Sequence, residues 1–90
     1  MAIIIANHKV KDFDAWKPYY DGDRKRRKQS GIKELKMGRK ADDPNEVFFI
    51  WESNDPQKII DMANNPELKE LMQKSGVVGE LSAIVLNEVK

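Results

Sequence analysis

Few side chains in this sequence could do chemistry, and two of them are neighbours near its start. His8 is the only histidine among the 90 residues. Histidine is also the side chain that titrates near neutral pH without help from its surroundings. Such a base can remove a phenolic proton, which raises electron density on the ring before oxygen attacks. A lone histidine near a strand end is more often an interface or surface residue, and both interpretations of His8 stay open.

Asn7 interrupts an apolar stretch, and a buried amide without a hydrogen-bond partner costs roughly 1–3 kcal/mol. It therefore either orients a substrate hydroxyl or carbonyl, or satisfies a neighbouring backbone group.

Trp51 either forms a cavity wall on which a flat ligand stacks, or is a core tryptophan whose indole N–H has a partner. Trp16 and Tyr20 share one helical stripe, which core packing explains as well as ligand binding does.

Other chemistries lack the residues that they require. The sequence has no cysteine, which excludes disulfides, thiolate metal sites and a cysteine nucleophile. One histidine and no clustered carboxylates predict no metal site and no cofactor. There is no P-loop, G-x-G-x-x-G or G-x-S-x-G motif, so nucleotide binding and serine hydrolysis have no support.

The charge balance argues against nucleic acid and membrane partners. Lys plus Arg is 16 and Asp plus Glu is 15, so the net charge is only +1. The basic run at 24–28 is interpreted as a solvated helix end, because cations complement the dipole there and no RNP1-like pattern accompanies it. No apolar run approaches the roughly 20 residues that span a bilayer. MAIIIA is too short for a signal peptide, and we expect a cytoplasmic protein.

Periodicity and turn residues predict the elements that must position these side chains. Strands are expected at 2–10, 32–39, 47–51 and 81–89, with a hairpin turn at 42–45 and a loop at 76–79. A turn at 12–16 should precede a helix that starts near Lys17, so that Pro18 falls in its first turn. That helix should stop at Ser30 and Gly31. Two further helices should follow Asp55-Pro56 and Asn65-Pro66.

A length of 90 residues indicates one domain, residues 1–90. The order of elements predicts an α+β, ferredoxin-like β-α-β-β-α-β fold with a four-stranded antiparallel sheet in the order 4-1-3-2 and both helices on one face. The two central strands contain Ile3-Ile4-Ile5 and Phe48-Phe49-Ile50, which are apolar on both sides. We therefore expect a face-to-face homodimer that covers the second face of the sheet.

Three segments, HKVKDFDAWKPYY, RKADDPNEVFFIWE and NNPELKELMQKSGV, resemble the dimeric α+β barrel superfamily, and within it the small proteins of the antibiotic-biosynthesis-monooxygenase type. The resemblance covers nearly the whole chain. It implies a barrel formed across the dimer and a cavity in each subunit, between helices and sheet, for an apolar or aromatic small molecule. The activities that it implies include cofactor-independent oxygenation of a phenolic ring. The alternative is a non-catalytic binding or sensor module with the same fold.

The haem-degrading branch of that superfamily allows a comparison residue by residue. Asn7 and Trp51 stand at positions matching that branch, but its histidine iron ligand falls at or near Met72, so haem degradation is not expected. The resemblance implies that Asn7 and Trp51 face the helices and the cavity, whereas His8 points toward the dimer partner. Asn7, which would orient the substrate, and His8, which would handle protons unless a bound water does, are the candidate catalytic residues. Trp51, Trp16, Tyr20 and Met72 are the candidate ligand-binding residues.

Overall fold

The computed structural model describes residues 1–89 and has the order β-α-α-β-β-α-α-β. Its elements are β1 (Ala2–Val10), α1 (Phe13–Gly22), α2 (Arg24–Gln29), β2 (Ile32–Lys40), β3 (Asp43–Ser53), α3 (Pro56–Ala63), α4 (Pro66–Ser75) and β4 (Val77–Asn87). No helix within the described residues is long and apolar enough to cross a membrane.

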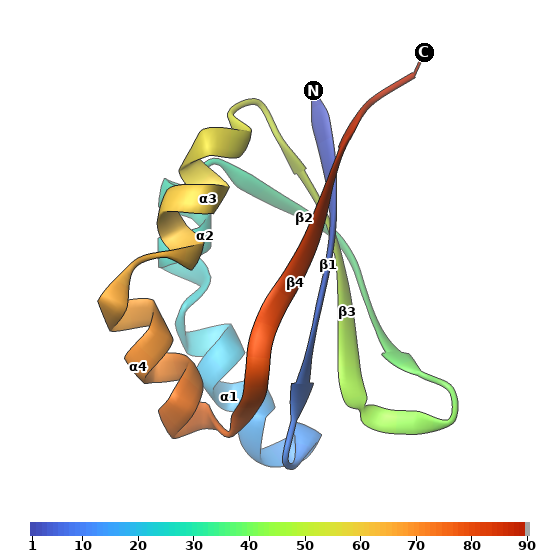
Figure 1. The fold of residues 1–90 in the computed structure, drawn as a ribbon, viewed down its shortest axis with the longest axis vertical. Coiled ribbons are helices and arrows are strands. Elements are labelled where there is room, and N and C mark those ends of the chain that lie inside the picture. The colour runs from blue at the N-terminus through green and yellow to red at the C-terminus, as the bar shows by residue number, and fades with distance from the viewer. Residues whose placement is uncertain (90) are drawn as a thin grey trace.

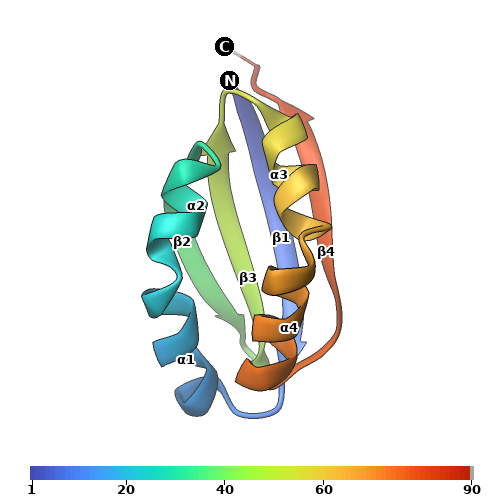
Figure 2. The same cartoon turned by 90° about the vertical axis from the view of Figure 1, so that its left-hand side faces the viewer.

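The four strands form one antiparallel sheet in the order β2-β3-β1-β4. All the helices lie on one face of this sheet (Figure 1). Figure 2 shows them in two columns, with α1 and α2 over β2 and β3, and α3 and α4 over β1 and β4. The predicted ferredoxin-like fold and strand order are confirmed.

The first helix starts earlier than predicted. The Asp12 carboxylate accepts a hydrogen bond from the backbone N–H of Asp14 at 3.1 Å, so the helix begins at Phe13 and Pro18 lies inside it. Proline in a helix interior costs about 3 kcal/mol because it removes a hydrogen bond and crowds the preceding turn. The cap and the burial of Trp16, which is only 2% exposed, offset this cost.

The last strand also starts earlier than predicted. Gly76 ends α4 in the left-handed conformation (φ 91°), and β4 begins at the next residue. Residues 77–79 of the predicted loop at 76–79 are therefore strand. Gly79 has a positive φ of 76°, and the pairing of β4 with β1 shifts register nearby, between Asn7 and Lys9. A β-bulge accommodates the glycine that had suggested a loop.

Strand alternation in β1 assigns Asn7 and His8 to the faces opposite to those expected. Residues paired across an antiparallel ladder share a face, and the register pairs Trp51 with Ile4 but Phe48 with Asn7. Trp51 faces the helices as predicted. His8, which is 6% exposed, also faces the helices, whereas Asn7 lies on the open face. The predicted orientations of Asn7 and His8 are therefore wrong, because Asn7 and Trp51 have opposite parity in the observed register.

The centre of the open face of the sheet is apolar. Ile5, Phe48, Ile50 and Ile84 lie on it, and each is more than a third exposed. The central strands therefore have apolar residues on both sides, in agreement with the pattern in the sequence.

Candidate ligand-binding cavity

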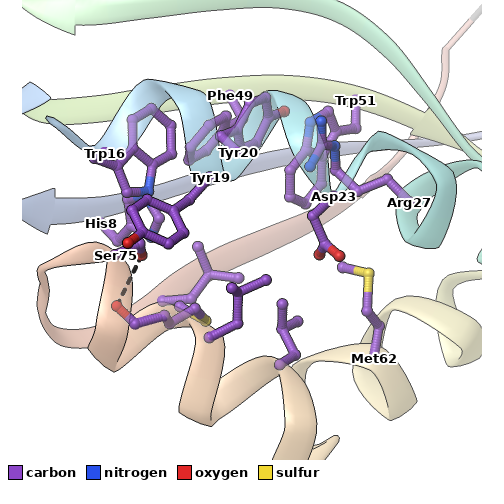
Figure 3. Close-up of a pocket in the computed structure, with 14 residues that line it drawn as sticks. His8, Trp16, Tyr19, Tyr20, Asp23, Arg27, Phe49, Trp51, Met62 and Ser75 are labelled. Carbon is purple, nitrogen blue, oxygen red and sulfur yellow. Dashed lines mark hydrogen bonds between the residues drawn. The ribbon is translucent and has the colours of Figure 1, made fainter. Parts of the chain in front are cut away.

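A cavity of about 60 Å³ lies between the two helix columns and the sheet (Figure 3). Its lining comes from α1 and α2 on one side, α3 and α4 on the other, and the strands behind. Its surface is predominantly apolar, as is usual for small-molecule sites.

Aromatic rings form one wall of the cavity. The ring of Tyr20 stacks on that of Phe49, with centroids 5.1 Å apart and planes at 21°. Trp16 lies 5.0 Å from Tyr20, and Trp51 lies 5.3 Å from Phe49. The helical spacing of Trp16 and Tyr20 and the strand spacing of Phe49 and Trp51 bring the four rings together. A flat ligand could extend this stack.

Flexible aliphatic side chains form the opposite wall. Leu68, Leu71 and Met72 come from α4, and Met62 comes from α3. Methionine is unbranched and packs adaptably. This wall can therefore change shape more easily than the aromatic one.

His8 is a polar side chain of the cavity whose hydrogen-bonding atoms are both unused. Neither Nδ1 nor Nε2 has a hydrogen-bond partner, although both atoms are buried. The imidazole instead meets the rings of Trp16 and Phe49 edge-on, at centroid distances of 5.2 and 5.1 Å. Burial lowers the pKa of His8 to about 4, so the ring is neutral at pH 7. A neutral imidazole carries one N–H donor and one nitrogen acceptor, and both are free for a ligand.

A second polar group lies toward the end of the cavity near Trp51, away from His8 (Figure 3). The guanidinium of Arg27 stacks on Tyr20, with Cζ 3.6 Å from the ring centroid. Its Nε donates to Glu34 Oε1 at 2.8 Å, and the Tyr20 hydroxyl donates to the same oxygen. The Nη2 of Arg27 is buried and has no partner.

The pKa values of the two groups bound to Arg27 shift in opposite directions. Burial, reinforced by the hydrogen bond to Glu34, raises the pKa of Tyr20 and keeps its hydroxyl protonated. Burial also acts to raise the pKa of Glu34, but the hydrogen bond from Tyr20 and the charge of Arg27 together lower it. Glu34 is therefore an anion at neutral pH and balances Arg27.

The structure brings most of the predicted residues together. His8, Trp16, Tyr20, Trp51 and Met72 all line the cavity.

Asn7 does not line the cavity, because it lies on the open face of the sheet. Its amide Nδ2 donates to Glu46 Oε1 at 3.2 Å. The partner of this amide is thus a side chain, rather than a backbone group or a substrate.

Sequence reasoning missed Arg27, because the basic run that contains it was interpreted as wholly solvated. Arg27 is 5% exposed. The signal that could have found it is helical spacing: Trp16, Tyr20, Asp23 and Arg27 follow one another at intervals of four, three and four. The stripe that carries the aromatic residues therefore continues into the basic run and ends in a cation.

A family model matches residues 2–88 of the chain. The chain belongs to the family described as Domain of unknown function (DUF3764). A comparison of this DUF3764 domain with curated proteins found no match.

Solved structures resemble the DUF3764 domain over its whole length. An antibiotic biosynthesis monooxygenase superposes with a TM-score of 0.69 at 18% identity, and the match covers 100% of both chains. A protein from Bordetella bronchiseptica, provisionally named for the same activity, superposes with a TM-score of 0.74 at 10% identity. This match covers 99% of the present chain and 97% of that protein. An uncharacterised NIPSNAP domain protein from Burkholderia xenovorans superposes with a TM-score of 0.66 at 10% identity. This match covers 99% of the present chain and 95% of that protein. These similarities confirm the expected resemblance at the level of the fold.

Proposed function

We propose that this DUF3764 domain binds a flat aromatic small molecule between its helices and its sheet, and that it does so as a homodimer. The observation that carries the proposal is that both ring nitrogens of His8 are buried without a hydrogen-bond partner. A buried imidazole with two unpartnered nitrogens is costly, and a ligand hydroxyl or carbonyl in the adjoining cavity would relieve that cost. The aromatic wall beside it supplies a stacking surface for the ring of the same ligand.

Binding requires the cavity to widen. Its volume is about 60 Å³, whereas an engineered cavity that binds benzene measures roughly 150 Å³. Rotation of Met62 and Met72 provides the extra space at low cost, because these side chains have several accessible rotamers. Closure of the methionines over the ring then excludes water from it.

The reaction that suits these groups is cofactor-independent oxygenation of a phenolic ring. His8 accepts the phenolic proton, because the phenolate that forms beside it offsets the burial that holds its pKa low in the empty cavity. The electron-rich ring then forms a carbon–oxygen bond with molecular oxygen. Loss of water then leaves a quinone. For an anthrone the balance is substrate plus O₂ giving anthraquinone plus H₂O, with no external reductant. The aromatic and aliphatic walls hold the ring while His8 moves the proton.

Oxygen uptake with anthrone or 1,4-naphthohydroquinone tests this reaction. We expect uptake by the wild type and a loss of about 100-fold in His8→Leu, in line with the removal of a general base. Asn7→Ala is the matched control, because the adjacent residue points to the opposite face, and it should retain the wild-type rate. Absence of uptake by the wild type across both substrates would rule out the oxygenase.

The second candidate is a non-catalytic carrier or sensor that uses the same cavity. It is favoured by the small number of polar groups that converge on the cavity, since Ser75 is already engaged by donating to the Met72 carbonyl at 2.9 Å. A carrier would bind aromatic molecules without consuming oxygen. Ligand titration and oxygen uptake on one sample therefore separate the two functions.

The proposed dimer joins the open faces of two sheets. Support comes from the exposed apolar side chains of β1, β3 and β4 on that face, of which Ile84 is 59% exposed. A face of this kind is unusual on a monomer. The partner is a second copy, because the same patch then covers itself about a two-fold axis.

A further inference from the structure

We infer that the ligand is an aromatic acid, whose carboxylate binds Arg27 while a ring hydroxyl or carbonyl meets His8. This inference rests on the proposed function and adds the chemical class of the ligand. It starts from the Nη2 of Arg27, a buried donor that has no partner. The side chain of Arg27 is 6% exposed and lines the cavity.

Arg27 is held in position by contacts that leave one edge of its guanidinium unused. Its plane stacks on Tyr20, with Cζ 3.6 Å from the ring centroid, and its Nε binds Glu34 at 2.8 Å. A guanidinium has five N–H donors in a fixed fork. The stacking and the Nε bond fix its orientation, and Nη2 remains available. Carboxylates are the acceptors that match this geometry best.

The charges at this end of the cavity are paired, so the case for an anion depends on the unused donor. Glu34 binds Arg27 and lies 3.7 Å from Arg24, and the Oδ1 of Asp23 is 3.1 Å from the Nε of Arg26. The exposed carboxylates of Asp21 and Glu67 each lie 3.9 Å from a second arginine, Arg24 and Arg26 respectively. None of these groups reaches the buried Nη2 of Arg27. A ligand carboxylate beside Nη2 would supply its missing acceptor.

The two polar groups stand toward opposite ends of the aromatic wall. Figure 3 shows His8 near Trp16, and Arg27 near Trp51. A ring stacked on this wall presents one substituent to each end. The geometry thus selects a ring with a carboxylate on one side and a hydroxyl or carbonyl on the other, and disfavours a plain hydrocarbon, which would leave both polar groups unsatisfied.

The test compares 4-hydroxybenzoate with 4-hydroxybenzamide, two molecules of nearly equal shape that differ in charge. Isothermal titration calorimetry at pH 7.5 gives both dissociation constants. We expect the carboxylate to bind about tenfold more tightly or better, as is typical of hydrogen bonds to charged groups. In Arg27→Met the ratio of the two dissociation constants should fall to about one. Lys28→Met, which removes the same charge from an exposed position on α2, should keep the preference of the wild type.

The stability of Arg27→Met is checked by circular dichroism. If that variant does not fold, Arg27→Lys retains the charge but loses the fork, and the preference should fall severalfold. Equal binding of the two probes by the wild type overturns the inference and leaves the proposed function standing. A preference that survives in a folded Arg27 variant overturns it too. If neither probe binds, the proposed function fails together with the inference.

Discussion

At the level of single residues, the protonation of His8 links the cavity to stability. Burial lowers the pKa of this histidine from 6.5 to about 4. Between these values the unfolded chain binds a proton that the folded chain does not. Stability therefore rises with pH across this window and is lost as the pH falls below about 6.5.

We expect the free energy of unfolding to decrease by about 2 kcal/mol between pH 7.5 and pH 5, since each pH unit within the window contributes up to about 1.4 kcal/mol. Urea unfolding at several pH values measures this decrease. His8→Leu should flatten the profile over the same range. Parallel profiles for the two proteins would show that His8 is not buried in its neutral form.

The types of the cavity residues could be predicted from the sequence, but their orientation could not. Trp16, Tyr20 and Trp51 are identified by their chemistry and spacing, and they do line the cavity. Asn7 and His8 alternate along one strand, so their faces depend on the register with β3. A shift of one residue in that register exchanges the faces, and no local feature of β1 fixes it.

At the level of elements, α1 carries a proline in its interior. Pro18 is exposed and lacks the N–H that would bond to the carbonyl of Asp14. The helix is maintained by its Asp12 cap and by the burial of Trp16. The element is therefore less stable than its other residues would allow.

Pro18→Ala should restore the missing hydrogen bond and remove the steric conflict. We expect it to stabilise the protein by about 1–3 kcal/mol, seen as a higher midpoint in thermal denaturation. Asp21→Pro, at an exposed position in the interior of the same helix, tests the opposite direction and should destabilise. A loss of stability in Pro18→Ala would mean that the proline ring contributes packing that outweighs its cost.

The order of the elements follows from the sequence, because strand alternation, helix periodicity and Asx-Pro caps are local signals. The third strand begins at Asp43, inside the turn predicted at 42–45. Two other boundaries were missed because each depends on a specific interaction. The Asp12 cap extends α1 past a proline that had suggested a later start. A bulge near Gly79 lets β4 continue through a glycine that had suggested a loop.

At the level of the whole molecule, we propose that two copies assemble through the open face of the sheet. A stable interface buries about 800 Å² on each partner. Ile84→Lys places a charge among the exposed apolar side chains of this face, beside Ile5 in the ladder. We expect a mass of twice 10.4 kDa for the wild type and of 10.4 kDa for this variant in multi-angle light scattering at micromolar concentration.

Ile60→Lys is the matched control for the dimer. Ile60 is also exposed, at 48%, but it lies on α3, on the other side of the molecule. This variant should remain a dimer. A monomeric wild type, or equal masses for the two variants, would contradict assembly through the sheet face.

The central claim, that an aromatic molecule binds between the helices and the sheet, can be tested directly because both tryptophans of the chain line the cavity. Their two indole N–H signals in an ¹H–¹⁵N NMR spectrum report on this site alone. Titration with 4-hydroxybenzoate should shift both signals and saturate, while amides of the exposed β2–β3 hairpin stay in place. Indole signals that do not move up to millimolar ligand would contradict the account.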